Sequence, residues 1–358
     1  MTCKPCCQPV DATRLSRRVF LRQATVAGAL ALWPTLSPKA AAPARLRLRL
    51  ATLLPRDTSG HKALLMMGEK WKTATQGAVE IANFYTDGVM GGELDMLRRI
   101  RAGQLHAALI TSMGLGEIHP DVNCIQKMPL VFRTLEEQTH VRNALLERFR
   151  ARMAEKGFML LFMTDAGWVR FFSKTRAVLP EEFRRLKIFA ERSDEPYIRL
   201  MRQIGFQPVP LEFTDILQGL TAGNMLDALA CAPFYALAGQ FYNAAKHMVD
   251  LNWVPLSGGL VLHRKTWDSL PADTQAALLK IATETGEEIQ SISRKENDDA
   301  VAAMEKRGLT VHRLDAAGQK SWEQFAEGVL PLVRGTLVPA EAFDEVMRLL
   351  KAYRAGKP

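Results

Sequence analysis

The chain has 358 residues, of which 47% are hydrophobic and 24% charged, and its formal net charge is +9. This composition excludes a disordered chain and a single small domain, and it favours a globule of about two lobes. Much of the positive charge belongs to residues 1–44. Without them the net charge falls to +4, spread along the chain with no basic block, so nucleic acid is not expected as a partner.

Residues 1–44 have the order of an export signal. Adjacent Arg17 and Arg18 are followed by Val-Phe-Leu, then by an apolar run from Ala24 to Trp33 and by small residues up to Ala44. Paired arginines in this context predict a twin-arginine signal peptide. Because the apolar run is shorter than the roughly 20 residues of a spanning helix, we expect cleavage after Ala44 and a periplasmic mature protein that does not cross the membrane.

Strands and helices alternate beyond residue 44, which predicts an α/β fold with a mostly parallel sheet. The predicted strands are 45–53, 78–85, 105–111, 158–164, 169–173, 186–190, 207–210 and 227–231. The predicted helices are 59–75, 92–102, 135–156, 195–204, 214–222 with Thr214 as its cap, 321–330 and 340–353. The stretch from Pro271 to Gly308 is helical in pattern, either as one long helix across both lobes or as two helices broken at Gly286.

Patterns that carry catalysis are absent from the sequence. The seven histidines are scattered without metal-ligand spacing, and no nucleophile elbow, phosphate loop or zinc cluster is present. We therefore expect neither an enzyme nor a bound cofactor or metal. Beyond the signal, Cys124 and Cys231 remain, and the sequence leaves open whether they form a disulfide.

Several segments together resemble the solute-binding component of tripartite ATP-independent periplasmic (TRAP) transporters, the DctP-type family. The resemblance runs from about Leu46 to Trp322 and is carried by the order and spacing of six segments, which are 72–81, 91–97 (Gly-Gly-Glu-Leu-Asp-Met-Leu), 127–132 (Lys-Met-Pro-Leu-Val-Phe), 179–188, 217–227 and 269–275. It implies a receptor that captures a small-molecule ligand and delivers it to the permease subunits of a TRAP transporter.

The resemblance also implies a periplasmic binding protein fold of two lobes with crossover strands, a hinge and a long helix spanning both lobes. On this basis lobe I comprises residues 45–165 with a returning segment near 256–270, and lobe II comprises 166–255. Residues 271–358 are expected to form C-terminal helices that span and pack on both lobes.

Two departures from the family pattern concern the ligand. The arginine with which most members hold a carboxylate is replaced by Phe189, and the segment from Asp227 to Pro233 lacks the polar residues that face the ligand in many members. A cleft without these anchors penalises an unpaired anion, so an apolar or amphipathic ligand is predicted, such as a lipid, fatty acid or aromatic compound. The predicted contacts are Met113, Met128, Trp168, Arg170, Phe171, Phe189, Phe234 and Tyr235.

Two alternatives remain open at this stage. The first is an ordinary organic acid, a dicarboxylate or a sugar acid, bound through Arg170 or Arg192. The second is a receptor that reports its ligand to a signalling partner instead of a permease.

Overall fold

The computed structural model describes residues 45–356, so the predicted signal peptide lies outside the described residues. The strands of the described part are β1 (Leu46–Thr52), β2 (Val79–Tyr85), β3 (Ala107–Thr111), β4 (Phe158–Ser173), β5 (Lys187–Glu191), β6 (Gln207–Leu211), β7 (Ala228–Cys231), β8 (His247–His263) and β9 (Thr310–Arg313).

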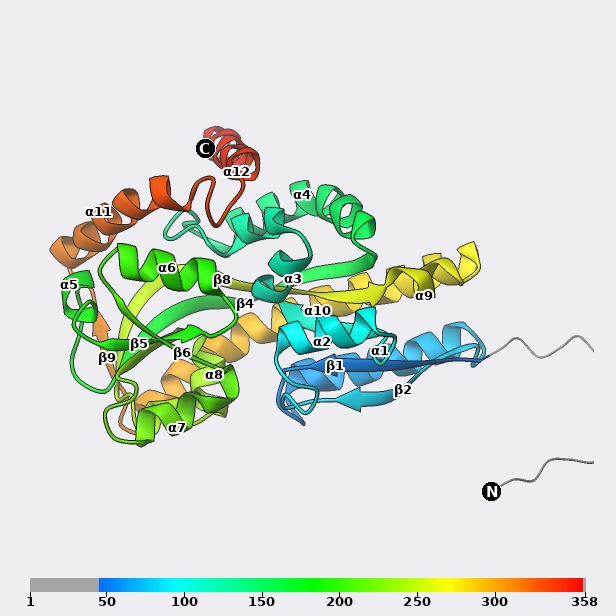
Figure 1. The fold of residues 1–358 in the computed structure, drawn as a ribbon, viewed down its shortest axis with the longest axis horizontal. Helices are drawn as coiled ribbons and strands as arrows, with labels where there is room; N and C mark the ends of the chain where they lie inside the picture. The colour runs from blue at the N-terminus through cyan, green and yellow to red at the C-terminus, as the bar shows by residue number, and fades with distance from the viewer. Residues whose placement is uncertain (1–44, 357–358) are drawn as a thin grey trace, which may run out of the picture. The chain divides into compact units, whose positions relative to one another are not determined.

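Helices cover this sheet (Figure 1). They are α1 (Ser59–Ala74), α2 (Glu93–Arg101), α3 (Ser112–Ile118), α4 (Leu135–Glu155), α5 (Pro180–Phe183), α6 (Glu195–Gln203), α7 (Ile216–Thr221), α8 (Pro233–Ala238), α9 (Arg264–Asp268), α10 (Ala272–Glu305), α11 (Ala316–Val333) and α12 (Ala340–Ala355). Short 3₁₀ turns lie at Pro120–Ile125, Phe213–Asp215 and Phe241–Asn243.

The strands form one mixed sheet in the order β2-β1-β3-β8-β4-β7-β5-β6, with β9 added to β8. Parallel pairing holds β1 to β2 and β3 in one lobe, and β5 to β6 and β7 in the other. The long antiparallel pair β4 and β8 crosses between them, since one end of β8 pairs with β3 and the other with β9. The fold is thus the predicted two-lobe α/β fold with crossover strands.

The stretch after Pro271 forms a single 34-residue helix, α10, and not two. It packs against α1, β4 and α8, so it contacts both lobes. Gly286 does not break it. A Cβ at this position would lie 2.7 Å from the ring of Phe162, so the glycine instead allows the close approach of α10 to β4. The Thr164 hydroxyl donates to the Gly286 carbonyl at 3.1 Å at the same contact.

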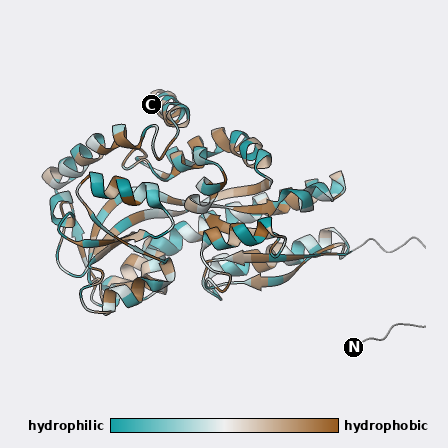
Figure 2. Cartoon of the chain, in the orientation of Figure 1, coloured by the Kyte–Doolittle hydropathy of each residue, from teal (hydrophilic) through white to brown (hydrophobic). Residues whose placement is uncertain are grey.

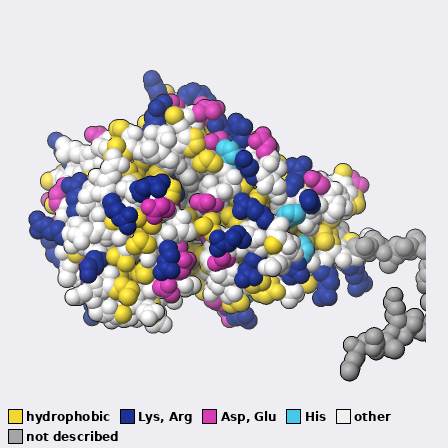
Figure 3. All heavy atoms as spheres, viewed as in Figure 1, with side chains coloured by type: hydrophobic (Ala, Val, Ile, Leu, Met, Phe, Trp, Pro, Cys, Tyr) yellow, Lys and Arg dark blue, Asp and Glu magenta, His cyan; other side chains and the backbone are white. Residues whose placement is uncertain are grey.

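The central strands are largely hydrophobic, whereas the helices carry both hydrophobic and hydrophilic residues (Figure 2). In α1, for example, the Thr58 side chain caps the first turn, and Leu64, Met67 and Trp71 are buried one turn apart on one face. On the face shown in Figure 3, basic and acidic side chains are interspersed. No helix of residues 45–356 combines the length and apolar character that a membrane span requires.

Two predictions about elements need correction, and one long strand was not predicted. The two strands predicted at 158–164 and 169–173 are one strand, β4, whose register shifts between Asp165 and Trp168. Thr214 does not cap a helix, because it lies inside the 3₁₀ turn that precedes α7. The long strand β8 was not predicted, since Pro255, Gly258 and Gly259 interrupt its pattern. The residue limits assigned to the lobes remain a prediction.

Candidate functional site

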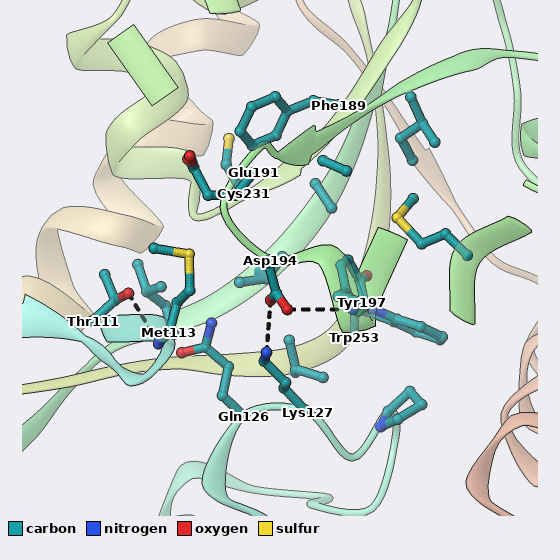
Figure 4. Close-up of a pocket in the computed structure, with 18 of the residues that line it drawn as sticks. Thr111, Met113, Gln126, Lys127, Phe189, Glu191, Asp194, Tyr197, Cys231 and Trp253 are labelled. Carbon is teal, nitrogen blue, oxygen red and sulfur yellow. Dashed lines mark hydrogen bonds and ion pairs between the residues drawn. The ribbon is translucent and has the colours of Figure 1, made fainter. Parts of the chain in front are cut away.

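A cavity of about 240 Å³ lies where strand ends of the two lobes meet (Figure 4). Hydrophobic side chains from both lobes and from the crossing strands make up most of its wall. They are Leu53, Met113, Pro129, Val169, Phe171, Ile188, Phe189, Ala190, Leu200, Met201, Ile204, Phe206, Phe213, Ala230, Cys231, Ala232, Trp253, Val254, Leu256, Val329, Val333 and Leu337. The volume lies just below the usual range for drug-sized ligands, which indicates a small ligand.

Four of the predicted contact residues line this cavity, namely Met113, Phe171, Phe189 and Tyr235. Figure 4 shows Phe189, on β5, above Glu191 and Cys231. Their role in binding a ligand remains a prediction.

Three other predicted contact residues lie outside the cavity wall. Met128 is 1% exposed and packs in the core. Trp168 and Phe234 are held by Asn297 of α10, whose amide nitrogen donates to the Trp168 carbonyl and whose amide oxygen accepts from the Phe234 N–H at 3.2 Å. These two residues therefore join β4 and α8 to the long helix.

Neither Arg170 nor Arg192 lines the cavity, which corrects the two positions predicted for a carboxylate-binding arginine. Side chains alternate along a strand, so Val169 and Phe171 face the cavity while Arg170 points to the opposite side of β4. There it forms an ion pair with Asp250 and a hydrogen bond with Asn252 at 3.3 Å. Arg192 is exposed just after β5.

The one basic residue among the described residues that line the cavity is Lys127. Its ammonium group lies 2.6 Å from the carboxylate of Asp194, and both side chains are largely buried, with 14% and 10% of their surface exposed. Asp194 is also the N-cap of α6 and accepts from the Tyr197 N–H at 3.3 Å. Since Lys127 precedes α4 and Asp194 follows β5, the pair joins segments 67 residues apart across the cavity.

Next to Lys127, the side chain of Gln126 also lines the cavity. Its amide oxygen accepts from the Ser257 N–H at 2.8 Å, which leaves the amide nitrogen as a donor beside Lys127 (Figure 4). A cation and an amide donor therefore lie together at this part of the wall, a combination that suits a carboxylate oxygen.

Carboxyl groups lie at another part of the wall. Glu93, the first residue of α2, accepts from the N–H and hydroxyl of Thr111 at 2.6 and 2.8 Å and from the Gly114 N–H at 2.9 Å. Burial raises the pKa of Glu93 in spite of these hydrogen bonds. Burial and the neighbouring Glu212 carboxyl raise the pKa of Glu191 to about 8, so this group is largely protonated at neutral pH and can donate a hydrogen bond.

A charged network lies beside the cavity where β4 shifts register. The Asp165 carboxylate receives two hydrogen bonds of 2.8 Å from Arg294 of α10 and one of 3.3 Å from Arg142 of α4. Gly167, with a φ of +83°, lies within this register shift and allows the irregular backbone there. The network thus fixes the crossover of β4 relative to α4 and α10.

Residues 45–356 contain neither a cluster suited to a metal nor a disulfide. Between Arg45 and Gly356 no group of three or more His, Cys, Asp or Glu side chains is arranged to hold a metal. Cys124 and Cys231 are both buried and not bonded to each other, which settles the disulfide left open by the sequence.

Two crossing strands, a helix that contacts both lobes and a cavity at the strand ends define a two-lobe binding protein. Residues 50–333 match the sequence profile of bacterial extracellular solute-binding protein, family 7 (DctP). The chain belongs to this family of periplasmic transport receptors, whose members are solute-binding proteins and not enzymes.

Individual relatives agree with this assignment. The chain is similar to the C4-dicarboxylate-binding periplasmic protein DctP of Rhodobacter capsulatus, at 24% identity over 317 residues that cover 87% of this chain and 92% of the relative. It is also similar to the structure of the sugar acid binding protein DctPAm from Advenella mimigardefordensis in complex with galactonate, with a TM-score of 0.79 and 14% identity over 86% of this chain and 99% of that one.

A third similar structure is a TRAP periplasmic solute binding protein from Desulfovibrio salexigens with bound orotic acid. Its TM-score is 0.78 at 17% identity, and the match covers 87% of this chain and 99% of that chain. These likenesses between structures establish the fold.

Proposed function

We propose that this protein captures a small organic acid with one carboxylate and a largely apolar body, and delivers it to the permease of a TRAP transporter. The observation that carries the proposal is the position of Lys127, a cation in a wall that is otherwise mostly apolar. An ammonium group has three donors, of which Asp194 uses one, so a ligand carboxylate can be bound without breaking the existing pair.

The apolar wall argues against a polyhydroxylated ligand. Phe171, Phe189 and Trp253 line the cavity and offer no partners for sugar hydroxyls other than the indole N–H. A second carboxylate is also disfavoured, because Lys127 is the one basic residue of the described wall and already pairs with Asp194, so a second anion would find no cation. The ligand therefore differs from the dicarboxylate and galactonate named for two of the relatives, but shares the carboxylate.

The proposal is tested by isothermal titration calorimetry on protein that has been unfolded and refolded to remove bound compounds. Benzoate and hexanoate are the probes, with hexanamide, succinate and galactonate for comparison. Binding of the two monocarboxylates and loss of binding for the uncharged amide are expected. Lys127→Met should weaken hexanoate binding by about 10- to 100-fold, because charge-assisted hydrogen bonds contribute about 1.5–3 kcal/mol.

Arg192→Met is the matched control, since Arg192 is an exposed cation outside the cavity wall. It should leave the affinity unchanged. The proposal is wrong if Lys127→Met has no effect on acid binding while Arg192→Met or Arg170→Met abolishes it. If only galactonate or succinate binds tightly, the ligand is an ordinary sugar acid or dicarboxylate instead.

Delivery to a permease and export through the twin-arginine route are parts of the same proposal. The family assignment supports the first, and Arg17 and Arg18 support the second. Uptake of labelled hexanoate by cells should require both this protein and a two-subunit permease, whereas a signalling receptor would leave uptake unchanged when it is deleted. Replacing Arg17 and Arg18 with lysine should keep the protein out of the periplasmic fraction.

A further inference from the structure

Two helices, α6 and α11, contribute a wholly apolar set of side chains to the cavity wall, and we call this part of the cavity the arm. The arm is walled by Leu200, Met201 and Ile204 at α6 and by Val329, Val333 and Leu337 at and after α11. These six side chains are all hydrocarbon or thioether, and the nearest polar side chain of the wall on α6 is Tyr197, about one turn before Leu200.

The arm lies in a part of the molecule that is otherwise densely packed. Leu200, Met201, Val329, Val333 and Leu337 are each at most 6% exposed and belong to the main hydrophobic core. Protein interiors contain few voids larger than a water molecule, and an apolar void stays dry because water finds no partners in it. A space of this kind that is continuous with a binding cleft suits the hydrocarbon part of a ligand.

We propose that this arm binds an unbranched hydrocarbon tail, so that the ligand is an alkanoic acid with its carboxylate at Lys127 and its chain between α6 and α11. The inference rests on the proposed function, since it takes Lys127 as the carboxylate contact. It adds that ligand length, and not only ligand charge, determines affinity.

A chain-length series tests the arm directly. Binding of butanoate, hexanoate, octanoate and decanoate to the refolded full chain is measured by calorimetry. Each methylene buried in an apolar space contributes a factor of about four in affinity, so the affinity should rise steeply with length until the arm is filled.

Val333→Phe places a larger side chain in the arm and should abolish the rise in affinity from butanoate to octanoate and decanoate. Leu330→Phe is the control, because Leu330 is on the same helix but outside the cavity wall. Val329→Phe, one turn earlier in α11, is made in parallel so that the test survives if one variant does not fold.

The outcomes separate the two proposals. If short acids bind through Lys127 but affinity does not rise with length, or if Val333→Phe and Val329→Phe leave the series unchanged, the arm is not a tail site and the proposed function stands. If no acid of any length binds, the proposed function fails and the tail site with it.

Discussion

The Asp165 network offers the sharpest test of what holds the crossing strand in place. The Asp165 side chain is fully buried and pairs with Arg142, of which 6% is exposed, and with Arg294. Asp165→Asn keeps the shape but removes the negative charge, which leaves two neighbouring arginines with no carboxylate between them. Breaking a buried ion pair from one side costs about 3–5 kcal/mol, so the free energy of unfolding should fall by about that amount.

Urea denaturation followed by circular dichroism measures this change. The slope of the unfolding free energy against urea concentration should stay the same, which shows that the folded and unfolded states keep their compactness. Asp344→Asn is the matched control, since its pair with Arg334 is exposed on both sides, is screened by water and should contribute far less. Adding Arg142→Met to Asp165→Asn should restore part of the loss, because it removes one unpaired charge. The reasoning is refuted if Asp165→Asn destabilises no more than Asp344→Asn.

Three further predictions follow from single contacts. The raised pKa of Glu191 means that folding favours the protonated carboxyl group, so the stability of the protein should decline as the pH rises from the ordinary pKa of 4.5 to about 8. Glu191→Gln should flatten this part of a plot of melting temperature against pH. An unchanged slope in the variant would exclude Glu191 as the cause of the decline. Gly286→Ala should lower the free energy of unfolding by about 1–3 kcal/mol through overpacking. Gly328→Ala is the control in the same urea assay and should stabilise α11, because an added Cβ there meets nothing within 4 Å. Equal effects of the two substitutions would contradict the packing argument. Burial raises the pKa of both Cys124 and Cys231, so a thiol reagent should label neither cysteine in the native protein. After unfolding without reductant, the reagent should label both. If it labels neither after unfolding, the two cysteines form a disulfide.

Much of the fold was predictable because local patterns and tertiary packing agree. The predicted strand 45–53 and helix 59–75 correspond to β1 and α1 within one residue at each boundary, although the cap of α1 is Thr58. The long strand β8 was missed because Pro255 and two glycines look like breaks, although pairing with β4 on one side keeps the strand continuous. Strand continuity here depends on partners distant in sequence.

The site was only partly predictable, for a similar reason. The resemblance to the family located Phe189, and the cavity does include it. Lys127 lies in one of the segments that resemble the family, but nothing in the local sequence marks it as a ligand contact. Its partner Asp194 is 67 residues away, and the side chain is buried only when the lobes meet. Arg170 was misplaced because its prediction did not take the alternation of β4 into account, which turns it away from Phe171.

The most direct test of the central claim is the identity of the compound that the protein retains when purified from the periplasm. Native mass spectrometry gives its mass and stoichiometry, and extraction with organic solvent followed by fragmentation gives its structure. The account predicts one molecule of a monocarboxylic acid with an apolar body per chain, and its loss in the Lys127→Met variant. A dicarboxylate, a sugar acid or an uncharged compound retained equally by that variant would contradict the account.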